Sequence, residues 1–90
     1  MAERILIVDD EKIIRESLAF VIKKEGYFVD EAGNGKEALK KHEQHPYDII
    51  ITDIEMPEMR GTELLNEIVK KTPQTFVIII TAFGSLETAI

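Results

Sequence analysis

The chain has no cysteine, no tryptophan and no apolar stretch long enough to cross a bilayer, for which a helix needs about 18 residues. The lack of cysteine excludes disulfides and thiolate metal sites, and it fits a reducing compartment such as the cytoplasm. There is no lysine- or arginine-rich run either, and the net charge is −6. We therefore expect a cytoplasmic domain that spans residues 1–90, without a membrane segment and without direct binding to nucleic acid.

Short β-branched runs are what the chain does have, and three of them end on residues suited to hold a metal ion or a phosphate. Residues 5–8 run into Asp9 and Asp10, residues 49–52 into Asp53, and residues 76–80 into Thr81. Such runs are typical of strands buried on both faces in a parallel sheet. Ligands bind at the carboxyl ends of parallel strands. We therefore expect these side chains to meet at one site.

Strand and helix patterns alternate along the rest of the chain. Strands are predicted at 4–8, 27–29, 48–52 and 76–80, and helices at 11–25, 36–44, 62–71 and from Ser85 onward. We expect Asp10 to be the N-cap of the first helix and Gly26 to follow its end. Residues 32–35 are expected to form a turn with glycine or asparagine at positive φ. This order predicts an α/β fold with right-handed crossovers.

The acidic cluster suits a hard cation. Carboxylates that lie together repel one another unless a cation or a shared proton relieves the repulsion. Mg²⁺ binds through one or two carboxylates and retains several waters. Asp53, at the end of the expected central strand, is placed to act as a nucleophile that forms an aspartyl-phosphate. The hydroxyl of Thr81 would then donate to a phosphoryl oxygen.

At four places the residues match one family. The matches lie at residues 8–11, 32–39, 53–61 and 81–82, and the D-x-x-M-P-x-M-x-G pattern at 53–61 is the most specific of them. The chain resembles the receiver domain of bacterial two-component response regulators. That resemblance implies a flavodoxin-like (CheY-like), doubly wound parallel sheet with strand order 2-1-3-4. It also implies a phosphoacceptor switch, rather than an enzyme, and we expect the output that it controls to be transcriptional.

The resemblance assigns roles to individual residues. Asp53 would accept a phosphoryl group from a sensor histidine kinase. Asp9, Asp10, Asp53 and the main-chain carbonyl of Glu55 would bind Mg²⁺. Thr81 and the backbone N–H of Ala82 would hold the phosphoryl oxygens. Residues 81–90 further resemble the NtrC group of receivers.

Family receivers continue into a fifth strand, which begins near a lysine, and a fifth helix. Neither lies within these ninety residues, so the resemblance predicts a receiver domain that is incomplete at its C-terminus. The strand at 76–80 would then be a long apolar edge, and part of the first helix would be uncovered. Self-association through either surface is expected.

Other interpretations stay open. A receiver-like interaction module that is not phosphorylated is one, and a Mg²⁺-dependent phosphatase or nucleic-acid enzyme with an acidic metal cluster is another. Taken alone, Asp9 and Asp10 suit helix capping as well as metal binding. His42 and His45 are expected to be solvated at a helix end, and Met56 and Met59 to be packing residues. A G-x-G pair at Gly33 and Gly35 without a third glycine is too weak for a dinucleotide site.

Overall fold

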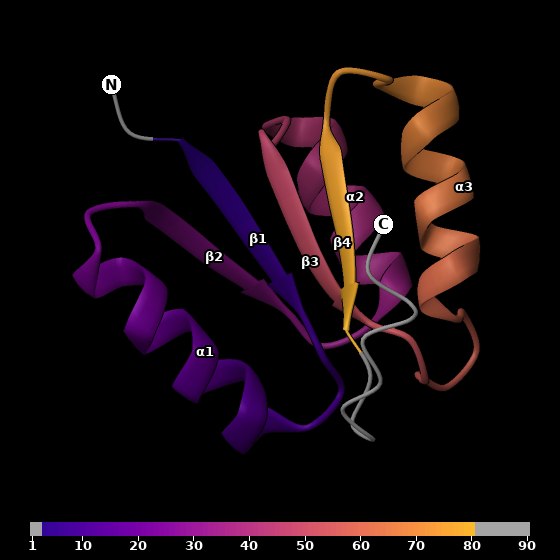
Figure 1. The fold of residues 1–90 in the computed structure, drawn as a ribbon. Coiled ribbons are helices and arrows are strands. Elements are labelled where there is room, and N and C mark those ends of the chain that lie inside the picture. Colours follow the sequence, from indigo (N-terminus) through magenta and orange to yellow (C-terminus); the bar gives the residue numbers. More distant parts are fainter. Residues whose placement is uncertain (1–2, 81–90) are drawn as a thin grey trace.

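Strands and helices alternate through the part of the chain that the computed structural model describes, residues 3–80 (Figure 1). The strands are β1 (Arg4–Val8), β2 (Phe28–Ala32), β3 (Ile49–Asp53) and β4 (Phe76–Ile80). The helices are α1 (Lys12–Lys24), α2 (Gly35–Gln44) and α3 (Gly61–Lys71). None of these helices is long and apolar enough to cross a membrane.

The four strands form one parallel sheet in the order β2-β1-β3-β4. All four arrows point the same way in Figure 1, so the carboxyl ends of the strands share one edge of the sheet. The predicted fold class and strand order are confirmed. Helical connections between parallel neighbours are what the alternating apolar pattern requires, because parallel strands need a crossover.

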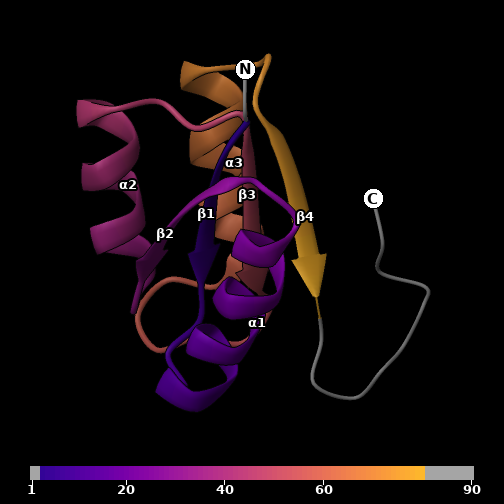
Figure 2. The same ribbon diagram turned by 90° about the vertical axis from the view of Figure 1, so that its left-hand side faces the viewer.

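Helices cover the two faces of the sheet unequally. Helix α1 lies on one face, while α2 and α3 lie together on the other (Figure 2). Strand residues alternate between the faces, so Leu6 and Ile50 join Leu64 and Ile68 in the larger core. The smaller core, on the α1 side, consists of Ile5, Ile7, Ala19 and Val29.

Strand β4 departs from the prediction of burial on both faces. Val77 and Ile79 are buried, but Phe76 is 74% exposed and Ile78 is 39% exposed. Helix α1 packs over β1 and β2, which leaves this side of β4 open within residues 3–80. Val69 of α3 is also exposed, whereas Leu64 and Ile68 of the same helix are fully buried in the core.

Turn chemistry differs in detail from the prediction. Gly26 follows α1 with φ of 96°, as expected, and its N–H donates to the Lys23 carbonyl. The prediction that a glycine or asparagine between β2 and α2 has a positive φ is wrong. Asn34 is extended, with φ of −163°, and its side chain accepts a hydrogen bond from the Glu37 N–H, which makes Asn34 the N-cap of α2. Strand β2 also begins one residue later than predicted and extends to Ala32.

Candidate functional site

Strand register brings the predicted carboxylates together. Val8 pairs with Thr52, so the next residues along β1 and β3 are Asp9 and Asp53. Asp9, Asp10 and Asp53 each offer a carboxylate oxygen within 4.8 Å of the others. Asp9 is 4% exposed, Asp53 is half-buried and Asp10 is exposed. The cluster therefore opens to solvent on the Asp10 side, at the carboxyl edge of the sheet.

Electrostatics within the cluster favour a cation. Burial is the largest cause that raises the pKa of Asp53, and the negative charges of Asp9 and Asp10 raise it further. Backbone N–H groups of Glu55 and Ile54 act in the opposite direction by stabilising the charged carboxylate. Three oxygen donors without sulfur or imidazole form a donor set of the kind that Mg²⁺ prefers. The residues present fit this ion.

The turn between β1 and α1 has a different arrangement from the predicted one. The N-cap of α1 is Glu11, whose side chain makes no capping hydrogen bond. The prediction that Asp10 caps this helix is wrong. Instead the Asp9 carboxylate accepts a hydrogen bond of 2.9 Å from the Glu11 N–H. The Asp10 side chain is exposed, at the open side of the cluster.

The loop between β3 and α3 approaches the site through its backbone. The Gly61 N–H donates to the Ile54 carbonyl at 3.0 Å, and a Cβ at Gly61 would lie 2.3 Å from the Asp53 carbonyl oxygen. Only glycine allows this approach. The Glu55 carboxylate forms an exposed ion pair with Arg60, in which Oε1 of Glu55 lies 3.0 Å from Nη2 of Arg60. Glu55 thus faces the cluster with its main chain, and the metal role of its carbonyl stays a prediction.

The methionines of this loop are packing residues, as predicted. Met56 is buried in the larger core, and Met59 packs against the same core. Met59 also covers Gly35, where an added Cβ would lie 2.6 Å from its sulfur. The loop is thereby attached to the start of α2. These contacts support the segment that follows Asp53.

Thr81 and Ala82 lie outside the described residues, so their predicted contacts with a phosphoryl group are not placed. The last described residue before them is close to the acidic cluster. Ile80 pairs with Asp53, and its carbonyl accepts a hydrogen bond of 2.9 Å from the Ile54 N–H. Strand β4 therefore ends beside the predicted acceptor.

His42 was expected to be solvated and is instead 3% exposed. Its Nε2 lies 2.7 Å from the Thr72 hydroxyl, and its Nδ1 accepts a hydrogen bond from the Tyr47 N–H. Burial, with a smaller effect of the Lys71 charge, lowers the pKa of His42. His45 is exposed, as expected. The two histidines do not form a ligand pair.

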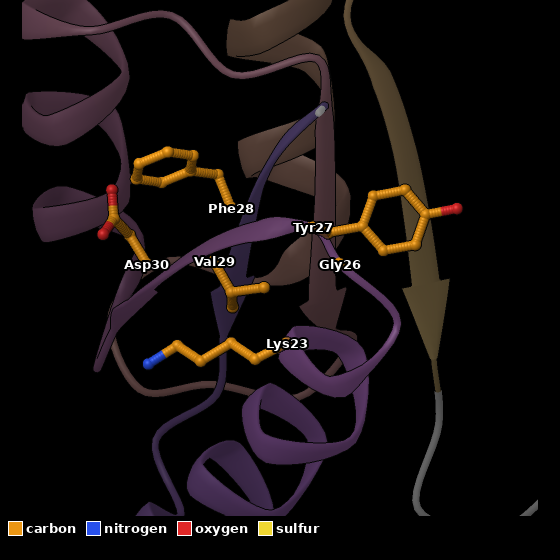
Figure 3. Close-up of a pocket in the computed structure, with 6 residues that line it drawn as sticks. All are labelled: Lys23, Gly26, Tyr27, Phe28, Val29 and Asp30. Atoms are coloured by element: carbon orange, nitrogen blue, oxygen red, sulfur yellow. The ribbon is translucent and has the colours of Figure 1, made fainter. Parts of the chain in front are cut away.

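A separate hollow lies at the other end of the sheet, near the amino-terminal end of β2. Figure 3 shows it between the end of α1 and the start of β2, with Tyr27 and Phe28 pointing to opposite sides. The acidic cluster lies at the carboxyl ends of the strands, so this hollow is not part of it. Its lining residues are Lys23, Gly26, Tyr27, Phe28, Val29 and Asp30.

Sequence reasoning missed Arg15, which contacts the turn that carries Asp9, and Glu31, which is paired with Arg15. The Arg15 guanidinium donates to the Asp9 carbonyl and to the Glu31 carboxylate. The only signal in the sequence was a charged residue beside the apolar stripe of the first helix. That pattern is also typical of a solvated helix face.

Comparisons with known proteins all indicate similarity to response regulators. The model of the response regulator receiver domain matches residues 5–90. The chemotaxis protein CheY of Thermotoga maritima is 44% identical over 85 residues, a match that covers 93% of this chain and 71% of CheY. The response regulator protein PilR of Pseudomonas aeruginosa is 41% identical over 88 residues, which cover 98% of this chain but 20% of PilR.

Solved structures show the same similarity. The response regulator TrrA of Thermotoga maritima, in complex with Mg²⁺-BeF, has a TM-score of 0.86 at 49% identity, covering 91% of this chain and 71% of TrrA. TrrA in complex with the histidine kinase ThkA has a TM-score of 0.87 at 45% identity, covering 98% of this chain and 76% of TrrA.

Proposed function

Because this chain belongs to the response regulator receiver domain family, we propose that Asp53 is its phosphoacceptor and that Mg²⁺ assists the transfer. The chain is a receiver domain of the two-component kind, related to CheY and PilR. In this proposal Asp9, Asp10, Asp53 and the main-chain carbonyl of Glu55 hold the ion. Thr81 and the backbone N–H of Ala82 hold the phosphoryl oxygens, on the resemblance alone.

The observation that carries the proposal is the juxtaposition of three carboxylates within 4.8 Å at the carboxyl edge of the sheet. Asp53 is the central member, and burial and its acidic neighbours raise its pKa. A bound Mg²⁺ would supply positive charge that offsets the charge of the carboxylates and of the phosphoryl oxygens. The backbone N–H groups of Glu55 and Ile54 stabilise the charged form of Asp53 and so lower its pKa.

In the transfer itself, the Asp53 carboxylate is the nucleophile and the histidine of the kinase is the leaving group. A carboxylate oxygen of Asp53 forms a bond to phosphorus as the P–N bond of a phosphohistidine breaks, and the electron pair of that bond goes to the imidazole. The product is an aspartyl-phosphate and a free histidine on the kinase. Asp53 must be ionised to attack, and its solvent-facing side leaves access to the donor.

We propose a sensor histidine kinase as the donor and an output domain or downstream effector as the recipient of the switch. A histidine kinase is bound to TrrA, a similar response regulator. PilR is five times longer than the matched segment, so a receiver of this kind exists within a larger regulator. In this proposal the domain works in the cytoplasm and assists its own phosphorylation and dephosphorylation without turning over a separate substrate.

Self-association is the further part of this proposal. Strand β4 pairs with β3 alone within residues 3–80, and Phe76 and Ile78 are exposed on it. Ile13 and Val21 of α1 are exposed as well. Apolar edges and helix faces of this kind favour pairing with a second copy. Sedimentation equilibrium at rising protein concentration tests it, and a monomer at high micromolar concentration would contradict it.

Incubation with acetyl phosphate and Mg²⁺, followed by mass spectrometry, tests the acceptor. We expect one added phosphoryl group on Asp53, none without the metal and none in an Asp53→Asn variant. Labelling that persists in that variant would refute the assignment. No labelling of the wild-type protein would favour an interaction module that is not phosphorylated.

An aspartyl-nucleophile phosphatase remains the second candidate and is less well supported. Such an enzyme would need a general acid two residues after Asp53, where Glu55 stands. The Glu55 carboxylate is paired with Arg60 at the surface. Release of many equivalents of phosphate from a phosphate ester would favour that candidate over the switch.

A further inference from the structure

Arg15 of α1 reaches from the helix to the turn that holds two of the acidic residues. Its Nη1 donates a hydrogen bond of 2.9 Å to the Asp9 carbonyl oxygen. Its Nε lies 3.0 Å from Oε1 of Glu31, in a partly buried ion pair. Arg15 therefore connects α1, the β1–α1 turn and the end of β2.

Asp9 is held by three hydrogen bonds. Its N–H donates to the Ala32 carbonyl at 3.2 Å, its carboxylate accepts from the Glu11 N–H, and its carbonyl accepts from Arg15. The first two bonds come from the adjacent strand and from the turn itself. Among the three partner groups, only the Arg15 guanidinium belongs to a side chain. Loss of that contact leaves the peptide between Asp9 and Asp10 free to rotate.

The peptide that begins at the Asp9 carbonyl also carries the N–H and Cα of Asp10. Rotation of this peptide moves the Asp10 side chain, which is exposed and makes no hydrogen bond within residues 3–80. The direction of the Asp10 carboxylate therefore depends on the Asp9 carbonyl. Contacts one step removed from a metal ligand commonly change metal affinity by about 10–100-fold.

The contact geometry requires an arginine. A guanidinium presents N–H donors in two directions from one rigid plane, so it reaches Glu31 and the Asp9 carbonyl at once. A lysine would keep the positive charge without the fork. The carboxylate of Glu31 in turn fixes the plane of the guanidinium, and the side chain of Arg15 is only 18% exposed.

We propose that Arg15, oriented by Glu31, is a positioning residue that presents the Asp9–Asp10 turn to the divalent cation. The inference rests on the proposed function and adds a residue that acts through the backbone of a metal ligand. Arg15 itself contacts neither the ion nor the phosphoryl group in this proposal. Both hydrogen bonds of the Arg15 guanidinium are to groups other than the metal-binding oxygens, the Asp9 carbonyl and the Glu31 carboxylate, so Arg15 acts by geometry.

Binding of Mg²⁺ measured by calorimetry is the first test, with Arg15→Ala, Arg15→Lys and Glu31→Gln compared with the wild-type protein. We expect about a tenfold increase in the dissociation constant for Arg15→Ala, within the range for such contacts. Arg15→Lys should fall close to Arg15→Ala, and Glu31→Gln should lie between them and the wild type. Lys71→Ala is the matched control, because it removes one positive charge from an exposed ion pair at the other edge of the sheet.

Amide hydrogen exchange in the metal-free protein is the second test. Faster exchange of the Asp9 and Glu11 amides, which donate to the Ala32 carbonyl and the Asp9 carboxylate, is the expected result in Arg15→Ala and Arg15→Lys, with unchanged exchange in the centre of β3. This measurement separates a local loss of order from a general loss of stability. It needs neither metal nor phosphoryl transfer.

Two results would overturn the inference. One is an Arg15→Lys variant that binds Mg²⁺ as the wild type does, because charge alone would then suffice. The other is an Arg15→Ala variant with unchanged affinity and unchanged exchange at the turn. Failure of the wild-type protein itself to bind Mg²⁺, with Asp53→Asn as the reference, would count against the proposed function; the exchange result would still decide the role of Arg15 in holding the turn.

Discussion

Gly61→Ala tests whether the close approach of α3 to β3 sets the position of the acceptor. An added Cβ would lie 2.3 Å from the Asp53 carbonyl oxygen, 3.0 Å from the Cα of Ile54 and 3.1 Å from the carbonyl carbon of Asp53. All three atoms belong to the backbone, so no side-chain rotation relieves the clash. The start of α3 and the end of β3 must therefore separate by at least 0.7 Å to restore a 3.0 Å contact.

The expected cost has two parts. Overpacking of this kind destabilises a protein by about 1–3 kcal/mol. Native domains have about 5–15 kcal/mol of stability, so the variant should still fold. The displacement also moves the Asp53 backbone, and a misplacement of about 1 Å reduces a reaction rate by up to about 100-fold. We expect phosphorylation by acetyl phosphate to fall by about 10–100-fold.

Gly26→Ala is the matched control for the loss of stability. Gly26 has φ of 96° and no neighbour within 4 Å of an added Cβ. An alanine there is strained by about 1–2 kcal/mol, yet Gly26 follows the C-terminal end of α1, far from the cluster. Urea denaturation should show similar losses for the two variants. Mass spectrometry of the aspartyl-phosphate over time should show slow labelling only in Gly61→Ala.

The reasoning would be refuted by a Gly61→Ala variant that loses stability but labels as fast as Gly26→Ala. In that case the displacement would be absorbed by α3 without moving Asp53. A crystal structure of the variant would locate the shift directly.

The remaining predictions concern charge, titration and packing. Asp53→Asn should raise the melting temperature of the metal-free protein, because ionised Asp53 is destabilised by burial and by its acidic neighbours, and added Mg²⁺ should then stabilise the variant less than the wild type. Burial lowers the pKa of His42, so this histidine binds a proton more readily in the unfolded chain than in the folded protein. The free energy of unfolding should therefore fall as the pH drops below about 6.5. Urea denaturation across pH should show this dependence in the wild type and its loss in His42→Gln. Leu64→Ala should destabilise the fold by about 2–5 kcal/mol in the same assay, since Leu64 is fully buried, whereas Val69→Ala on the exposed side should cost much less.

That the three carboxylates lie together could be predicted from the sequence, because this expectation depended on one local pattern and one general rule. Apolar strands with an acidic residue at the end are visible in the residues themselves, and parallel strands share an edge. The cluster of Asp9, Asp10 and Asp53 follows from these two facts. The prediction of the N-cap was wrong because it followed the general preference for aspartate at that position, whereas the turn geometry places Glu11 directly before α1.

Burial was predicted less well than element order. His42 and Val69 both lie on helices near the polar boundary of the apolar stripe, and their exposure depends on what packs opposite them. His42 meets Thr72 and Tyr47, which are distant in sequence. Phe76 and Ile78 are apolar yet exposed, because α1 packs over β1 and β2 and not over β4.

The sequence by itself determined the order of strands and helices, the parallel sheet and the carboxyl edge at which the acidic residues meet. Hydrophobic periodicity and short apolar runs are local properties, so they can be read without coordinates. Only the tertiary structure decided the pairing of Val8 with Thr52, the hydrogen bond from the Arg15 guanidinium to the Asp9 carbonyl and the close contact of Gly61 with the end of β3. Each of these joins segments that are separate in the chain, and such contacts are set by packing in three dimensions.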